Sequence, residues 1–242
     1  MKGIVLAGGL GTRLHPLTKV TNKHLLPVYD KPMIYYPLHS VKQAGCSEAM
    51  VVIGGPFAGH FVSVLKNGEE FGFKRFQYGY QEAEGGIAEA LSLTEEFAGG
   101  EGVMVFLGDN ILKSDLSSYY KKYQHSGKAC VFAKKVEKPN QFGVVKFDED
   151  GKVIAIEEKP KVPPSNYAVI GVYMYPGDVY SKIRKLDYSS RGELEVTDLN
   201  NLYIQEGRMD VVFLEDEDYW SDCGSFESLL RSNLEVGVSP DA

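Results

Sequence analysis

Three glycines and two cationic residues near the start of the chain have the types and spacing that bind phosphate groups. Gly8, Gly9 and Gly11 follow an apolar segment, and glycines there let backbone N–H groups gather around phosphate oxygens. Arg13 ends this loop, and Lys23 follows ten residues later. Such donors and cations suit the roughly four negative charges of a nucleoside triphosphate. Taken alone, the glycines are better explained by a tight turn, and each cation by a solvated surface position.

The loop departs from two common nucleotide-binding motifs. The dinucleotide-binding pattern GxGxxG, begun at Gly9, would need glycine where Leu14 stands. The P-loop pattern fails because no GK[ST] follows the glycines. A nicotinamide-dependent dehydrogenase is therefore disfavoured, and the chain shows no Ser-His-Asp triad or HExxH motif either.

Two aspartates stand beside apolar segments, where they could face a ligand. Asp109 follows the apolar run Val103–Leu107, and Asp222 precedes the apolar segment Phe226–Leu230. Ligands bind at the carboxyl ends of the strands in open parallel sheets, which favours a site at Asp109. From local sequence alone, an N-cap role explains each aspartate about as well.

The elements that must position these residues alternate along the chain. Short apolar runs predict buried strands at Lys2–Ala7, Ala49–Ile53, Val103–Leu107, Ala129–Ala133 and Val169–Tyr175. Helical patterns occupy Pro32–Ala44, Phe57–Lys66, Gly86–Phe97, Leu116–His125, Val179–Leu186 and Val196–Gln205. Pro37 should bend or break the first of these helices. The alternation implies βαβ units and a mainly parallel sheet.

The pattern changes between Gly143 and Glu157, where two apolar segments flank an Asp150-Gly151 pair, as in a hairpin. A β-rich insertion beside the α/β sheet follows from this. We expect one domain over residues 1–242, with parts at about 1–128 and 129–222 and a C-terminal helix at about 224–236. The tail after Glu235 should fray.

Composition excludes several classes of protein. Of 242 residues, 43% are hydrophobic and 24% charged, and the net charge is −7, which disfavours binding to nucleic acid or anionic membranes. No apolar stretch is long enough for a membrane span. The three cysteines form no CxxC or zinc-like spacing and suit reduced thiols in a cytoplasmic protein.

The segment Gly3–Pro32 resembles the opening signature of the sugar nucleotidyltransferases, LxGGxGTRLxPxTxxxxKxLxPVxxKP. Later segments resemble the glucose-1-phosphate thymidylyltransferases in particular: Gly108–Ile111, Phe142–Val145, Glu157–Pro160, Ser165–Tyr175, Arg191–Asn200 and Trp220–Leu230. The resemblance runs from Met1 to about Leu234. It implies the nucleotide-diphospho-sugar transferase fold, a Rossmann-like, mainly parallel α/β sheet flanked by helices, with the β-rich insertion binding the sugar.

The reaction that this resemblance implies is transfer of a deoxythymidylyl group from dTTP to glucose-1-phosphate, which gives dTDP-glucose and pyrophosphate. This would be the first step of dTDP-rhamnose or deoxysugar synthesis. The attacking phosphate is ionised at neutral pH, so catalysis needs alignment and charge neutralisation rather than a general base. The resemblance also implies Mg²⁺ on Asp109 and Asp222, with phosphate oxygens and water completing the octahedron.

The resemblance also assigns roles to residues. Arg13 would contact the β- and γ-phosphates, Lys23 the α-phosphate and Lys159 the sugar phosphate, and these three are the catalytic set. The nucleotide-binding set is Leu6, Gly8, Gly9, Gly11, Thr12, Arg13, Lys23, His24, Gln81 and Gly86, in which Gln81 and Gly86 read the base. The sugar-binding set is Asn110, Gly143, Glu158, Lys159, Val169, Ile170 and Arg191. The acids Glu193, Glu195 and Asp198 should fix a loop rather than do chemistry.

The chain departs from its longer relatives at several positions. His24 and Glu89 stand where many relatives carry Gln, Ile170 where Thr is frequent, and Cys223 where Thr or Ala is usual. Relatives also continue past the last helix, so much of the region that builds their secondary regulatory site and subunit contacts should be missing. A homo-oligomer is still compatible with the composition.

Three alternatives stay open at this point. Gln81 and Gly86 do not separate dTTP from UTP, because both bases present the same imide edge. Another hexose-1-phosphate would fit the same motifs. A non-catalytic regulator that binds a nucleotide sugar is the alternative from another class, and it should have lost the charged residues that this chain keeps.

Overall fold

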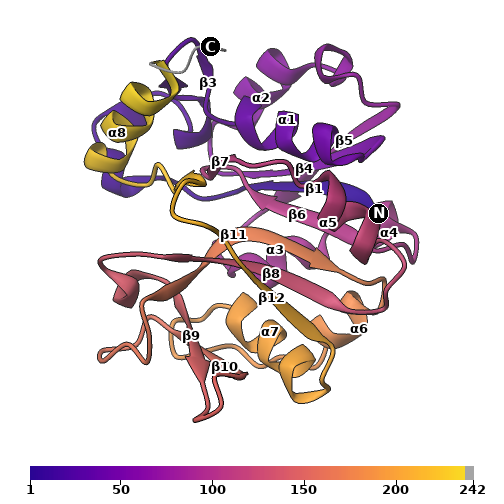
Figure 1. Cartoon of the computed structure of the whole chain (residues 1–242). Coiled ribbons are helices and arrows are strands. Elements are labelled where there is room, and N and C mark those ends of the chain that lie inside the picture. Colours follow the sequence, from indigo (N-terminus) through magenta and orange to yellow (C-terminus); the bar gives the residue numbers. More distant parts are fainter. Residues whose placement is uncertain (238–242) are drawn as a thin grey trace.

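The computed structural model describes residues 1–237, in which the core is a nine-stranded sheet (Figure 1). Its parallel half has the order β6-β1-β4-β5, with strands at Val103–Leu107, Lys2–Ala7, Glu48–Gly54 and Arg75–Gln81. From β1 the chain builds outward to β4 and β5, and then returns to add β6 on the other side. The carboxyl ends of β1 and β6 therefore flank a topological switch point, where open α/β sheets bind ligands.

The other half of the sheet is mostly antiparallel and is built on β11 (Tyr167–Tyr175). This strand pairs antiparallel with β6 and with β8 (Ala129–Lys135), and β12 (Met209–Phe213) adds to β8 in parallel. The predicted hairpin is confirmed as β9 (Gly143–Phe147) and β10 (Val153–Glu158). The long strand β11 thus joins the β-rich part to the parallel sheet.

Helices cover both faces of this sheet (Figure 1). One face carries α1 (Tyr35–Ala44), α2 (Ala58–Leu65) and α5 (Ser117–Tyr123). The other carries α3 (Ile87–Ser92), α4 (Glu95–Ala98), α6 (Val179–Ile183) and α7 (Val196–Gln205). In β1, Val5 and Ala7 face the first core while Ile4 and Leu6 face the second, which explains the continuous apolar run.

Smaller elements complete the described chain. Two short antiparallel pairs are β2 (Pro27–Val28) with β3 (Lys31–Pro32), and β7 (Ile111–Lys113) with β13 (Tyr219–Ser221). The C-terminal helix α8 (Phe226–Gly237) packs over β2 on a separate small core. Single 3₁₀ turns lie at Thr12–Leu14, Leu17–Lys19, Lys23–Leu25, Glu69–Phe71 and Pro139–Gln141.

The α/β class with flanking helices is confirmed, and two helix predictions are corrected. Pro37 does not break α1, because it lies in the first turn, where its missing N–H has no partner to lose. The predicted helix Gly86–Phe97 is divided into α3 and α4 at Thr94, whose hydroxyl donates to the Leu91 carbonyl at 2.7 Å.

Two further expectations concern the C-terminal tail and membrane-spanning helices. The predicted fraying after Glu235 concerns a tail whose residues 238–242 lie outside the described part. None of the helices within residues 1–237 has the length and apolar character that a membrane crossing requires.

Candidate active site

The glycine loop follows β1 directly at the switch point, and its neighbours require glycine. A Cβ on Gly8 would lie 2.6 Å from Oε1 of Gln81, and one on Gly11 would lie 2.8 Å from Cβ of Lys23. Gly11 also has a φ of 67°, in the left-handed region. The Asn22 amide donates to the Gly9 carbonyl at 3.3 Å. The loop therefore packs closely against both Lys23 and the end of β5.

Lys23 and Asp109 form a tight ion pair across the switch point. Nζ of Lys23 lies 2.5 Å from Oδ2 of Asp109, and the two side chains are only 14% and 13% exposed. Burial would raise the pKa of Asp109, but the Lys23 ammonium together with hydrogen bonds from Lys23 and Asn110 holds the pKa below the usual value. The strand ends are held together because the Gly108 N–H donates to the Leu6 carbonyl at 2.8 Å. Asp109 is therefore a fixed carboxylate at neutral pH.

His24 is a buried, neutral neighbour of this pair. Burial and the adjacent Lys23 charge lower the pKa of His24 to about 3. Oδ1 of Asn22 accepts hydrogen bonds from the His24 backbone N–H at 3.1 Å and from Nδ1 at 2.6 Å. The amide oxygen only accepts, so Nδ1 carries the ring proton and Nε2 remains an acceptor.

Asn110 connects Asp109 to the segment that carries Asp222. Its amide nitrogen donates to Oδ1 of Asp109 at 2.8 Å. Its amide oxygen accepts from the Gly171 N–H at 3.0 Å and from the indole Nε1 of Trp220 at 2.7 Å. Asn110 is only 2% exposed, and its contacts with β11 and β13 hold it in place. It thus orients the Asp109 carboxylate.

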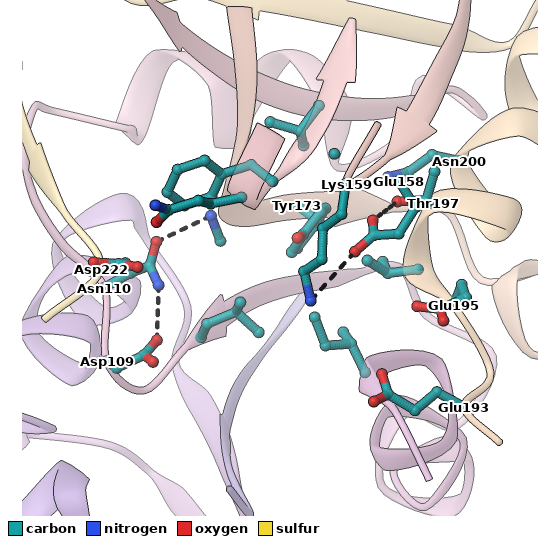
Figure 2. A pocket seen from close by; sticks show the side chains of 18 of the residues that line it. Asp109, Asn110, Glu158, Lys159, Tyr173, Glu193, Glu195, Thr197, Asn200 and Asp222 are labelled. Atoms are coloured by element: carbon teal, nitrogen blue, oxygen red, sulfur yellow. Dashed lines mark hydrogen bonds and ion pairs between the residues drawn. The ribbon is translucent and has the colours of Figure 1, made fainter. Parts of the chain in front are cut away.

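Across the cavity from Asp109, Asn110 and Asp222 lies a second polar group around Glu158 at the end of β10 (Figure 2). Oε2 of Glu158 accepts a hydrogen bond from the Thr197 hydroxyl, and Oε1 lies 3.7 Å from Nζ of Lys159. Arg191 reaches the same carboxylate at 3.4 Å and binds Glu195 at 2.6 Å. Glu195 also accepts from the Ser189 hydroxyl, so it fixes the loop as predicted.

Two residues beside the cavity have a strained backbone. Lys159 and Cys223 both have a φ of 41°, which side chains with a Cβ rarely adopt. Lys159 follows Glu158, and Cys223 follows Asp222. Strain of this kind concentrates at functional sites because the surrounding structure must maintain it.

Two cavities meet at Asp109. The smaller, of about 310 Å³, includes these residues of the glycine loop and its neighbours: Leu6, Gly8, Gly9, Lys23, His24, Gln81 and Gly86. The larger, of about 550 Å³, includes Asn110, Gly143, Glu158, Lys159, Val169, Arg191, Asp222 and Arg13. Ile87, Leu107, Asp109 and Glu193 line both. Ligands that fill the two cavities would therefore meet beside these shared residues.

Four residues depart from their predicted places. Gly11 and Thr12 belong to the loop but do not line either cavity. Arg13 lines the larger cavity, and a Cβ on Gly224 would lie 2.8 Å from its guanidinium. Ile170 lies outside both cavities because it is fully buried in the opposite core, while Val169 and Gly171 on the same strand line the cavity.

Several lining residues were not identified from the sequence. The larger cavity also contains Gly171, Tyr173, Thr197, Asn200 and Trp220. The spacing of two along β11 from Val169 could have identified Gly171 and Tyr173. Thr197 and Asn200 lie three residues apart on α7, so they share a helix face, but only the packing of α7 shows where that face points.

The donors fit a divalent cation that is shared with bound ligands. Five carboxylates and three cations line the larger cavity: Asp109, Glu158, Glu193, Glu195, Asp222, Arg13, Lys159 and Arg191. Anionic ligands would add to this excess of negative charge unless a cation compensates. No group of three or more His, Cys, Asp or Glu side chains that could hold a metal occurs within residues 1–237. Oxygen donors from two aspartates, ligand and water suit Mg²⁺.

Comparison with known proteins agrees with this geometry. The sequence profile of the nucleotidyl transferase family matches residues 2–237. The chain is 42% identical over 234 residues to glucose-1-phosphate thymidylyltransferase of Mycolicibacterium smegmatis, covering 96% of this chain and 81% of that protein. It is 42% identical to the Neisseria meningitidis enzyme of the same name, covering 95% and 80%. A Bacillus anthracis protein assigned this activity, crystallised with a sucrose, superposes with a TM-score of 0.92 at 44% identity, covering 99% and 96%.

Proposed function

The chain belongs to the nucleotidyl transferase family, and we propose that it is a glucose-1-phosphate thymidylyltransferase. It joins dTTP and glucose-1-phosphate to give dTDP-glucose and pyrophosphate. The observation that carries this proposal is the meeting of two cavities at Asp109, one lined by the glycine loop and one by the β-rich part. Two anionic substrates bound in this way would meet at their phosphates.

The nucleotide occupies the smaller cavity in this proposal. Backbone N–H groups of the glycine loop and the Lys23 ammonium surround its phosphates, and Gln81 and Gly86 face the base. Lys23 is already beside Asp109, at the junction with the larger cavity, so its charge lies where the α-phosphate must be held. Arg13 lines the larger cavity near Gly224, so its guanidinium must turn toward the nucleotide cavity to contact the departing pyrophosphate.

The sugar phosphate occupies the larger cavity. The Glu158 carboxylate accepts from sugar hydroxyls, and the Thr197 hydroxyl fixes one of its oxygens in place. Lys159 and Arg191 supply positive charge for the phosphate of glucose-1-phosphate. Arg191 is bound to Glu158, Glu193 and Glu195, so a rearrangement of these bonds must accompany its contact with phosphate.

The chemical step is an in-line displacement at the α-phosphorus. An oxygen of the sugar phosphate forms the new P–O bond, the bond from the α-phosphorus to the bridging oxygen breaks, and its electron pair leaves with pyrophosphate. The attacking oxygen is already ionised, so the buried neutral His24 is not required as a base. Alignment and neutralisation by Lys23, Arg13 and Lys159 provide the catalysis.

Asp109 and Asp222 hold Mg²⁺ in this proposal, and enzymes of the family generally need a divalent metal. The ion supplies charge neutralisation for the two phosphates. Asn110 orients one of the two carboxylates, and Lys23 must release part of its contact with Asp109 as the site fills.

The test is a pyrophosphate-release assay with each of dTTP, UTP, dCTP and ATP against glucose-1-phosphate and other hexose-1-phosphates. We expect turnover with dTTP and glucose-1-phosphate that stops in excess EDTA and returns with Mg²⁺. A strong preference for UTP or for another hexose would redirect the assignment within the family. No pyrophosphate release with any pair would support the non-catalytic alternative, although all five charged residues of the proposed machinery are present: Arg13, Lys23, Asp109, Lys159 and Asp222.

A further inference from the structure

Glu89 holds the side chain amide of Gln81, which lines the smaller cavity. Nε2 of Gln81 donates to Oε2 of Glu89 at 2.6 Å and to the Gly86 carbonyl at 3.3 Å. Both amide hydrogens therefore bond to oxygens of the protein. Oε1 of Gln81 accepts no hydrogen bond from any other residue in the described chain, and it points toward Gly8, at 2.6 Å from the position of a Cβ there. Gln81, Gly8 and Gly86 all line the smaller cavity.

The loop around Glu89 is built so that this carboxylate stays in place. A Cβ on Gly85 would lie 2.1 Å from Oε2 of Glu89. Gly86 has a φ of 97°, and a Cβ on it would lie 2.6 Å from the Leu194 carbonyl. The Leu194 N–H donates to the Gly85 carbonyl at 2.8 Å, which joins the loop to the segment before α7. The two glycines thus let Glu89 reach Gln81 from the first turn of α3.

A carboxylate at this position decides which end of the amide faces the base. Glu89 only accepts hydrogen bonds when ionised, and so does the Gly86 carbonyl. Rotating the Gln81 amide by half a turn would place its oxygen against both acceptors and lose a charge-assisted bond. The orientation with Oε1 on the side of Gly8, which lines the smaller cavity, is therefore enforced.

We propose that Glu89 is a positioning residue for base selection, acting through Gln81. The fixed Gln81 carbonyl requires a donor on the base. The imide of thymine or uracil presents N3–H there, whereas N3 of cytosine is an acceptor and opposes it. Glu89 thereby selects imide bases over cytosine but does not separate dTTP from UTP. This inference rests on the proposed nucleotidyl transfer at the same site.

The test compares Glu89→Ala and Glu89→Gln with the unchanged chain, using dTTP, UTP and dCTP at saturating glucose-1-phosphate. In Glu89→Ala the amide is free to rotate and to offer Nε2 to cytosine. The ratio of kcat/KM for dTTP over dCTP should fall about tenfold or more, which corresponds to about 1.4 kcal/mol. The same ratio for Glu89→Gln should lie between those of the unchanged chain and Glu89→Ala. The carbonyl of the new glutamine can still accept from Gln81, but its own amide can rotate.

Three measurements separate selection from a general structural role. The dTTP to UTP ratio and the KM for glucose-1-phosphate should stay unchanged, because neither depends on the orientation of Gln81. Glu96→Ala, an exposed carboxylate on α4, is the control for loss of one negative charge and should leave all ratios unchanged. Equal losses for dTTP and dCTP in Glu89→Ala would overturn the inference, and Glu89→Gln provides the same test if the alanine variant does not fold.

Binding without turnover separates this inference from the proposed function. Calorimetry with dTDP and dCDP, without sugar phosphate, should show the same fall in preference in Glu89→Ala. An unchanged chain that releases no pyrophosphate from dTTP would refute the proposed function, while the diphosphate ratio would still test Glu89. A ratio that stays the same in both variants would refute the role of Glu89 and leave the proposed function standing.

Discussion

Replacing Lys23 with methionine should destabilise the metal-free protein strongly, because it leaves a buried carboxylate without its cation. The ammonium lies 2.5 Å from Asp109, and the two side chains are 14% and 13% exposed, so water cannot replace the lost partner well. Removing one member of a buried pair costs about 3 kcal/mol or more. For a chain of this length, such a loss corresponds to a fall in Tm of about 6–12 °C.

The effect should depend on pH in a defined direction. In the unchanged protein the pKa of Asp109 is lowered, because its neighbours, Lys23 foremost, together outweigh burial. The pair therefore contributes stability above the ordinary pKa of 3.8 and loses it as pH falls through the lower folded-state value. Without Lys23, burial dominates and raises the folded-state pKa above that of the unfolded chain. The variant then loses stability as pH rises. The difference in unfolding free energy between the two proteins should therefore grow from pH 5 to pH 7.

Urea unfolding in EDTA at pH 5, 6 and 7 measures this difference. The single tryptophan, Trp220, bonds to Asn110 beside the pair and reports on the site by its fluorescence. Lys146→Met is the matched control, because Lys146 lies 2.8 Å from Glu157 but both side chains are exposed, at 44% and 38%. Its effect should stay within about 1 kcal/mol. A loss for Lys23→Met that is the same at every pH would refute the ion-pair argument and assign the effect to packing of the Lys23 stem against Gly11.

Three further predictions concern catalysis. Arg13→Ala should reduce kcat/KM by about a hundredfold or more, with a fall in kcat, because charge develops on the departing pyrophosphate. An unchanged kcat with a raised KM in steady-state assays would show instead that Arg13 binds substrate and transition state equally. Lys159→Ala should raise the KM for glucose-1-phosphate far more than that for dTTP, and equal changes in initial-rate measurements would contradict its place in the sugar cavity. Oε1 of Glu84 accepts from the Leu10 N–H at 3.0 Å, so its carboxylate occupies a donor of the glycine loop. Glu84→Ala removes this acceptor and frees the Leu10 N–H, so it should lower the KM for dTTP, and a raised KM would show that this contact supports the loop.

The parallel centre of the sheet could be predicted because its strands are buried on both faces. A strand such as Lys2–Ala7 must be apolar throughout, and this leaves a continuous run that local sequence reveals. The strand Arg75–Gln81 was not predicted, because it lies at the sheet edge and only partly buries its alternating polar and aromatic residues. The hairpin was predictable because Gly151, with a φ of 76°, marks its turn.

The sequence by itself determined which residue types were available for phosphate chemistry, because the glycine loop, Arg13 and Lys23 are close together along the chain. Only the tertiary structure decided how they are used. Lys23 meets Asp109 across 86 positions of sequence because β1 and β6 are neighbours in the sheet, and no local pattern encodes that neighbour. Side chains alternate between the two faces of β11, and the pairing of this strand places Ile170 in the core rather than in the cavity. The direction of the Gln81 amide depends on a carboxylate that reaches it from the next helix, so it is a property of packing rather than of the motif.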